Sequence, residues 1–301
     1  MGRLGVSSLP YPTKPYRIDH LKGGLSGGPI FETRTNARDE DFHRAKSLAK
    51  VVNRFSSSDP TATLDLARRL ASGQSCDRRT LASSRYMRRF RLRLIGALWP
   101  LVADGPWTPG EVSSFTAIPR GWSFTPGTLE TADPRKLLAR LRSQLNRAGA
   151  KDADGFLIAH LHGEFEPQSR IYQLHVHGIA AGGMIAAIDR LRTTPSYTSD
   201  GLVRGRMHIS RKPLKDIPYP LGYPFKSYWP CRRIGMVGRE GLIKRQRGHH
   251  RIPEPYHSQV LLWLDRWSVS DLTLLMNLRV GRDGFVASPP KYVHQFEGNG
   301  E

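Results

Sequence analysis

Two histidine pairs are the residues of this sequence best suited to carry chemistry. His160 and His162 form the first pair, His175 and His177 form the second, and a glycine follows each pair. Both pairs lie in runs of alternating apolar residues, which are typical of β-strands, and side chains two apart on a strand share a face. Imidazole nitrogens bind zinc, manganese and other first-row divalent ions. The doubled pattern therefore predicts a metal site.

The two runs, 155–166 and 171–180, are joined by Pro-Gln-Ser-Arg, which predicts a β-hairpin. Closing the turn at this point places His162 opposite His175 and His160 opposite His177. A slip of one residue would turn half of the apolar side chains towards water, so the register is strongly specified. All four histidines should then share one polar face, with Glu164 beside them.

A tyrosine-rich segment follows the histidines in the chain. Tyr223 and Lys226 are three residues apart, so they would share a face on one helical turn. A phenol can attack phosphorus when a cation or metal stabilises the developing negative charge. Tyr-Pro-rich segments are more often packing loops. The Tyr223–Lys226 spacing therefore indicates a catalytic role only in combination with the histidines.

The net charge indicates a polyanionic partner. The 301 residues include 46 Lys and Arg but 26 Asp and Glu, which gives a formal net charge of +20. Residues 1–110 carry +10 and residues 201–301 carry +9, whereas residues 111–200 carry only +1. A near-neutral centre between basic flanks is expected for a reaction site bordered by phosphate-binding surface.

Composition also limits the class of protein. The two cysteines are too few for a disulfide framework, which favours a reducing, cytoplasmic location. No run is long and apolar enough to span a bilayer, and no signal-peptide core is present at the start, so no membrane partner is expected.

The N-terminal third is expected to be an arm followed by basic helices. Residues 1–35 are rich in Gly and Pro, and helical patterns follow near 38–56, 60–73 and 78–99, the last ended by Pro100. The third helical segment has seven arginines and no acid after Arg78, which predicts a DNA-binding surface made of Arg78, Arg79, Arg85, Arg88, Arg89, Arg91 and Arg93.

The remaining elements predict an α+β fold with an antiparallel sheet and helices on one face. A strand is expected at 112–118, a helix capped by Asp133 and ended by Gly149, and a helix over Met184–Leu191. Two closing helices are expected over 255–280. The predicted units are an arm (1–35), a basic helical region (36–105), a catalytic domain (106–235), and a basic linker with C-terminal helices (236–301).

Three segments together resemble the HUH endonucleases, in particular the rolling-circle replication initiators of plasmids and phages. Phe115–Trp122 is similar to the first strand motif of that family, His175-Val176-His177 to its histidine–hydrophobe–histidine motif, and Tyr223–Lys226 to its Tyr-x-x-Lys motif. An Arg-rich lead-in at residues 70–94 adds to the likeness. The resemblance covers about residues 70–235 and implies a palm-like sheet of the ferredoxin or RRM type, with helical additions at both ends.

The resemblance also implies a mechanism. His175 and His177, with a third ligand from the neighbouring strand, would hold Mn²⁺ or Mg²⁺, with Zn²⁺ as an alternative. His162, Glu164 and His160 compete for the third place, and pairing favours His162. Tyr223 would attack single-stranded or origin DNA, giving a 5′-phosphotyrosine link and a free 3′-hydroxyl, while Lys226 positions or neutralises the phosphate. A host helicase and a polymerase are the expected partners, because the sequence has no nucleotide-binding motif of a helicase.

Several alternatives stay open at this point. Pro224 pushes Tyr223 away from helical geometry, and Tyr219 and Tyr228 are rival nucleophiles. A decayed, non-catalytic DNA-binding protein of the same fold is one alternative function. A cupin-like metalloenzyme is another, since Glu166 follows the first histidine pair, but Gln173 stands where that motif needs glycine.

Overall fold

The computed structural model of the chain describes residues 33–52, 59–72, 80–102, 105–198, 208–215, 219–237, 242–245, 250–281 and 284–287. The arm predicted at residues 1–35 lies outside these residues, apart from its end. No helix within the described residues is both long enough and apolar enough to cross a membrane.

Seven α-helices lie in the described part of the chain: α1 (Arg34–Val51), α2 (Pro60–Ser72), α3 (Ser84–Val102), α4 (Pro134–Leu145), α5 (Met184–Arg190), α6 (Tyr219–Gly222) and α7 (Tyr256–Asp265). The three predicted N-terminal helices are thus confirmed, but α3 continues two residues past Pro100, which was expected to end it. A proline so near the end of a helix removes only one hydrogen bond. The Asp133 carboxylate accepts from the backbone N–H groups of Arg135 and Lys136 and starts α4 as predicted.

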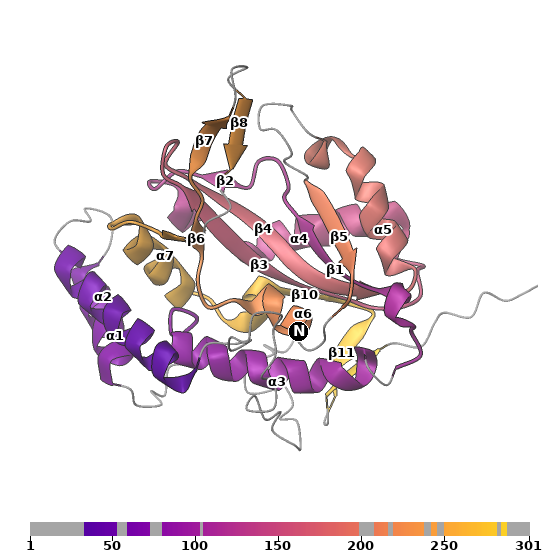
Figure 1. The fold of residues 1–301 in the computed structure, drawn as a ribbon, viewed down its shortest axis with the longest axis horizontal. Coiled ribbons are helices and arrows are strands. Elements are labelled where there is room, and N and C mark those ends of the chain that lie inside the picture. The colour runs from indigo at the N-terminus through magenta and orange to yellow at the C-terminus, as the bar shows by residue number, and fades with distance from the viewer. Residues whose placement is uncertain are drawn as a thin grey trace, which may run out of the picture.

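An eight-stranded sheet forms the centre of the molecule (Figure 1). Its main path runs β5-β1-β4-β3-β6-β9, while β10 pairs with β3 and β2 pairs with β4. The bounds are β1 (Val112–Ala117), β2 (Ser123–Phe124), β3 (Leu157–Glu166), β4 (Ile171–Ala181), β5 (Ile209–Pro213), β6 (Pro230–Cys231), β9 (His250–Arg251) and β10 (Thr273–Met276). All of its pairings are antiparallel except that between β3 and β6.

Two short hairpins stand outside this sheet, β7 (Ile234–Val237) with β8 (Leu242–Arg245), and β11 (Leu278–Val280) with β12 (Phe285–Ala287). The β7–β8 hairpin projects beyond the body of the fold (Figure 1). The α+β class and the mostly antiparallel sheet are therefore confirmed.

The prediction of a second closing helix within 255–280 is wrong, because a 3₁₀ turn and a strand occupy its place. α7 is present, and the Ser268–Asp271 capping box forms, but it starts only a 3₁₀ turn over Val269–Leu272. The chain then continues as β10, whose residues Leu274 and Met276 are buried while their neighbours are half-buried. Alternating burial is the signature of a strand, and β10 pairs antiparallel with β3.

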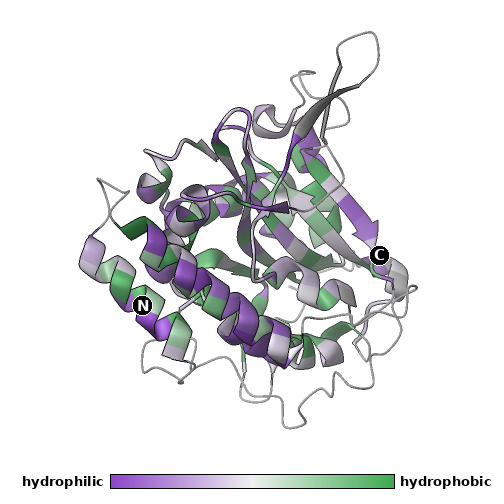
Figure 2. Ribbon diagram, turned by 60° about the vertical axis from the view of Figure 1, so that its left-hand side comes forward, coloured by the Kyte–Doolittle hydropathy of each residue, from purple (hydrophilic) through white to green (hydrophobic). Residues whose placement is uncertain are grey.

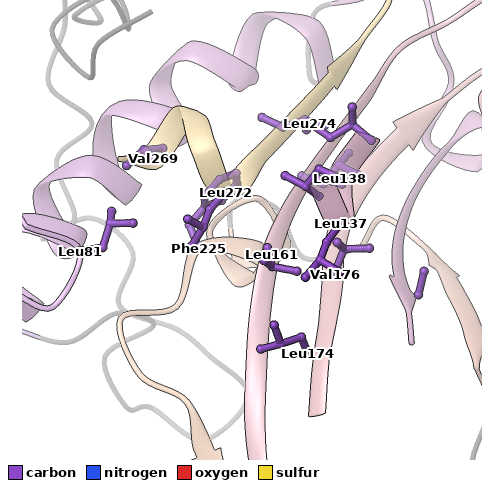
Figure 3. Close-up of a cluster of buried hydrophobic side chains, with 14 of the residues drawn as sticks. Leu81, Leu137, Leu138, Leu161, Leu174, Val176, Phe225, Val269, Leu272 and Leu274 are labelled. Atoms are coloured by element: carbon purple, nitrogen blue, oxygen red, sulfur yellow. The ribbon is translucent and has the colours of Figure 1, made fainter. Parts of the chain in front are cut away.

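Helical structure covers both faces of the sheet rather than the single face that the sequence predicted. On one side, Leu137 and Leu138 of α4 gather with Leu161, Leu174 and Val176 of the β3–β4 hairpin (Figure 3). On the other side, a 3₁₀ turn over Tyr223–Phe225 lies against the sheet, and Phe225 contacts Phe90 of α3 with ring centroids 5.6 Å apart.

One hydrophobic cluster joins the N-terminal helices, the central sheet and the C-terminal elements. It includes Leu48 of α1, Leu98 of α3, Val176 of β4 and Leu274 of β10, each almost fully buried. Hydrophilic and hydrophobic residues mix along the outer helices (Figure 2), as expected for helices that pack on one side only. The N-terminal helices and the last strand of the sheet thus share a core with the site described next.

Candidate metal centre

The β3–β4 hairpin has the register that its sequence predicts. His162 lies opposite His175, and His160 lies opposite His177. The alternate residues, such as Leu161 and Val176, are buried on the other face of the hairpin (Figure 3). The turn and the apolar alternation therefore bring all four histidines to one face.

Three of these histidines form a compact cluster. His162, His175 and His177 each offer one ring nitrogen, and these three atoms lie within 4.8 Å of one another. The side chains are buried, with 3%, 4% and 8% of their surface exposed. Three buried histidines are thus close enough to hold a metal ion, and His162 is the residue that joins the His175–His177 pair.

Hydrogen bonds on the far side of two rings fix which nitrogen is free. His162 Nε2 lies 2.9 Å from the carbonyl oxygen of Tyr228, and a carbonyl can only accept, so Nε2 carries the proton. His162 Nδ1 then holds a lone pair, and it is buried without a hydrogen-bond partner among the described residues. His175 Nδ1 donates in the same way to the Gln173 carbonyl at 3.2 Å, which leaves its Nε2 with a lone pair.

His177 completes the set. Its Nε2 lies 3.1 Å from His175 Nε2, and its Nδ1 lies 2.8 Å from the Thr116 hydroxyl. A hydroxyl can donate or accept, so rotation of the Thr116 hydroxyl lets His177 keep its proton on Nδ1 and offer Nε2 as a lone pair. The buried Nδ1 of His162 and the two facing Nε2 atoms therefore fit a divalent ion with an affinity for imidazole.

Burial favours the neutral form of two of the clustered histidines. Desolvation, followed by the charges of His175 and Lys226, lowers the pKa of His162 well below its usual value, and desolvation and the neighbouring histidines do the same for His177. A histidine must be neutral to bind a metal ion. These rings are therefore ready to bind at neutral pH without first losing a proton.

His160 shares the face but not the cluster. Its Nδ1 lies 3.0 Å from the Thr273 hydroxyl of β10, and its ring packs on Phe225 with centroids 4.7 Å apart. Burial lowers its pKa to about 3. The structure thus gives His160 a packing role, and the cupin-like ligand set that pairs it with His162 is not assembled.

Tyr223 and Lys226 lie in contact beside the three-histidine cluster. The prediction that they share one helical turn is wrong. Tyr223 begins the 3₁₀ turn, while Lys226 is already extended. The Tyr223 ring lies edge-on to His177, with centroids 5.0 Å apart, and Lys226 Nζ lies 3.7 Å from the Tyr223 ring centroid. Such a contact is a cation–π interaction, which orients both side chains.

The ammonium of Lys226 is partly desolvated. Burial, and then the charges of Arg232 and Arg91, lower its pKa to about 8. Lys226 is consequently still mostly protonated at neutral pH, with a weakly hydrated charge that an anion can approach.

The three clustered histidines, Tyr223 and Lys226 line one cavity of about 280 Å³. Its walls are Thr116, Ile118, His162, Glu164, His175, His177, Tyr223, Lys226, Tyr228, Pro230 and Arg232. Glu164 lies in the wall with its carboxylate 3.4 Å from Arg232 Nε, outside the compact cluster of nitrogens. The cavity therefore combines three imidazoles, two tyrosines, a carboxylate and two cations around one opening.

Some cavity residues were not foreseen in the sequence. Thr116 was assigned only to a strand, yet β1 pairs with β4 and sets Thr116 opposite His177. Arg232 follows β6, a strand too short to be recognised from its sequence. Alternation along both strands could have indicated that β1 pairs with β4. That pairing would have pointed to Thr116 as a neighbour of His177.

The other candidate tyrosines are placed differently. Tyr228 lines the cavity and is 40% exposed, and its carbonyl binds His162. The backbone of Tyr219 begins α6, but its side chain lies outside the described part of the structure.

The arginines predicted to bind DNA have several environments. Arg85 Nε donates to the Asp41 carboxylate at 2.7 Å, and its guanidinium also donates to the Leu70 carbonyl. Arg85 therefore joins α3 to α1 and α2. Arg91 is buried, Arg88 and Arg93 are half-buried, and Arg89 is exposed. Arg78 and Arg79 lie outside the described residues. Of the described arginines, Arg89 is therefore the one that α3 presents to solvent.

Protein-family models, curated proteins and solved structures were all compared with the chain, and none of them matches it.

Proposed function

We propose that the protein nicks single-stranded DNA by metal-assisted attack of Tyr223 on a phosphodiester, in the manner of the HUH endonucleases that its motifs resemble. One observation carries the proposal. The Tyr223 ring packs against His177, a member of the three-histidine cluster, and beneath Lys226, inside a single cavity. A phenol, a cation and a metal-binding cluster are the groups that a phosphoryl transfer by tyrosine requires.

His162, His175 and His177 would hold the ion. A divalent metal there would supply a Lewis acid that polarises the phosphodiester. Three imidazole nitrogens favour Mn²⁺ or Zn²⁺ over Mg²⁺, which prefers oxygen ligands. We therefore expect Mn²⁺ to support the reaction better than Mg²⁺.

In the proposed step, the phenolic oxygen of Tyr223 forms a bond to phosphorus, and the bond from phosphorus to the 3′-oxygen breaks. The phenolic proton passes to water, and the leaving 3′-oxygen takes up a proton to become a 3′-hydroxyl. Lys226 offsets the negative charge that develops on the phosphoryl oxygens. The products are a 5′-phosphotyrosine link and a 3′ end that a host polymerase can extend.

The test is a covalent adduct. Purified protein with Mn²⁺ is incubated with a pool of single-stranded oligonucleotides of randomised sequence that carry a label at the 3′ end. Because the downstream fragment is the one joined to tyrosine, the label should move with the protein on a denaturing gel. Tyr223→Phe, which removes one oxygen atom, should lower the adduct at least about a hundredfold.

Two matched variants serve as controls. Tyr228→Phe makes the same change at another tyrosine of the cavity and should keep the adduct, whereas its loss would move the nucleophile to Tyr228. His177→Gln should abolish the adduct and His160→Gln should not. Tight oligonucleotide binding without any adduct would contradict the proposal and favour a non-catalytic DNA-binding protein.

A further inference from the structure

A buried arginine of α1 makes three hydrogen bonds that link distant parts of the chain. Arg44 is fully buried. Its Nε donates to Glu40 at 2.8 Å, one terminal nitrogen donates to the Ala82 carbonyl at 2.7 Å, and the other donates to the Ser227 carbonyl at 2.8 Å. A planar guanidinium can satisfy three acceptors in fixed directions, which an ammonium cannot do.

Ser227 lies between two residues of the cavity. Lys226 precedes it and covers the Tyr223 ring, and Tyr228 follows it and accepts a hydrogen bond from His162 Nε2. The Ser227 hydroxyl also lies 3.3 Å from the Ser84 hydroxyl at the start of α3. The backbone that fixes the proton of His162 is therefore itself held by α1 and α3.

We infer that Arg44 is a positioning residue for the metal centre, acting through the Ser227–Tyr228 backbone to hold His162 with its Nδ1 free for the ion. The inference rests on the metal-binding part of the proposed function and not on the cleavage of DNA. Groups that orient a metal-binding histidine commonly contribute tenfold to a hundredfold to metal affinity.

The test measures binding of Co²⁺, whose visible absorption reports the ligands around it, by titration of the full chain. Arg44→Lys keeps a positive charge next to Glu40 but cannot reach all three acceptors. We expect it to lower Co²⁺ affinity by roughly tenfold to a hundredfold and to alter the visible spectrum.

Arg69→Lys is the matched control. Arg69 also joins two helices, through Asp65 of α2 and Asp265 at the end of α7, and neither acid lines the cavity. This variant should lose thermal stability while its Co²⁺ affinity and spectrum stay unchanged. A loss of affinity common to both variants would mean that Arg44 only stabilises the fold.

A double variant tests whether Arg44 affects Co²⁺ binding through His162. If Arg44 acts through His162, then Arg44→Lys should have little further effect on Co²⁺ affinity in a His162→Ala background. The same fold-change in both backgrounds would overturn the inference. Should Arg44→Lys fail to fold, Ser84→Ala removes the hydrogen bond to the Ser227 hydroxyl without burying a charge. About a threefold loss of affinity is then expected, and an unchanged affinity would again overturn the inference.

Wild-type protein separates this inference from the proposed function. If it binds no Co²⁺, both fail. If it binds Co²⁺ and Arg44→Lys binds equally well with the same spectrum, only the role of Arg44 fails. Co²⁺ binding that depends on Arg44 without any DNA adduct would support the positioning role and contradict only the chemistry.

Discussion

The hydrogen bonds behind the three clustered histidines decide what their rings can do. The carbonyls of Tyr228 and Gln173 fix the protons of His162 and His175, so each ring keeps one nitrogen with a lone pair. Thr116 leaves His177 able to hold its proton on either nitrogen. Backbone carbonyls thus determine which nitrogens of His162 and His175 could bind an ion.

The fourth histidine makes stability depend on pH. Burial lowers the pKa of His160 to about 3 in the folded protein, against about 6.5 in an unfolded chain. The unfolded chain takes up the proton first, so the free energy of unfolding should fall as the pH drops from about 6.5 towards 3. The slope for this residue is up to roughly 1.4 kcal/mol per pH unit.

Urea unfolding between pH 7 and pH 4, with EDTA present to remove metal, measures this slope. In His160→Gln the free energy of unfolding should fall less steeply with decreasing pH, by the equivalent of about one proton. Circular dichroism at pH 7 checks that the variant is folded. An equal slope in both proteins would show that His160 is not buried in its neutral form.

At the residue scale the sequence predicted how the four histidines pair across the hairpin. Turn position and apolar alternation were enough to fix the hairpin register, because a slip of one residue would expose the core face. The separation of His160 from the cluster could not be predicted in this way. It depends on Phe225 and Thr273, which approach the hairpin from segments far along the chain.

Helix α3 shows how neighbouring elements change the role of a charged side chain. The absence of acids within residues 78–99 predicted a phosphate-binding surface, but the acid that pairs with Arg85 is Asp41, 44 residues away on α1. Asp41 is fully buried and also accepts from the Ser83 hydroxyl. A charge pattern within one segment therefore cannot tell an exposed arginine from one paired across helices.

Substitutions of Arg85 and Arg89 should distinguish an arginine that stabilises the fold from one that binds phosphate. Arg85→Ala leaves Asp41 buried without its cation, so we expect about 3 kcal/mol of destabilisation. Arg89→Ala should leave stability unchanged and weaken binding of a single-stranded oligonucleotide, with a salt dependence smaller by about 0.7 in log–log slope if Arg89 contacts one phosphate. Thermal melts and fluorescence anisotropy measure the two effects. Equal stability loss in both variants would contradict the assignment.

The misassigned strand β10 has a related cause. A capping box marks the start of a helical turn but not its length, and short apolar runs are ambiguous between helix and strand. The edge of β3 resolves the ambiguity by pairing with residues 273–276. That partner lies more than a hundred residues earlier in the chain, beyond any local pattern.

At the scale of the whole molecule, the net charge of +20 should dominate association with nucleic acid. Contact with four phosphates of a single strand would reduce affinity roughly fiftyfold between 50 and 200 mM salt. Anisotropy titrations of a short single-stranded oligonucleotide in EDTA measure this without cleavage. An affinity that does not change with salt would contradict a phosphate-binding surface.

The helical, catalytic and C-terminal units predicted from the sequence all contribute residues to one hydrophobic cluster. Shifts in composition mark where charge changes, and they carry no information about which apolar faces meet.

The long reach of Arg44 has a consequence for the order of events during synthesis. Its acceptor at Ser227 lies 183 residues later, so the guanidinium of α1 leaves the ribosome long before its partner exists. The His175–His177 pair also emerges before the Tyr228 carbonyl that orients His162. Until that late segment arrives, the nascent chain carries histidines without an oriented third ligand. Orientation of His162 within the three-histidine cluster is therefore a late event in the folding of this chain, because it requires Ser227 and Tyr228.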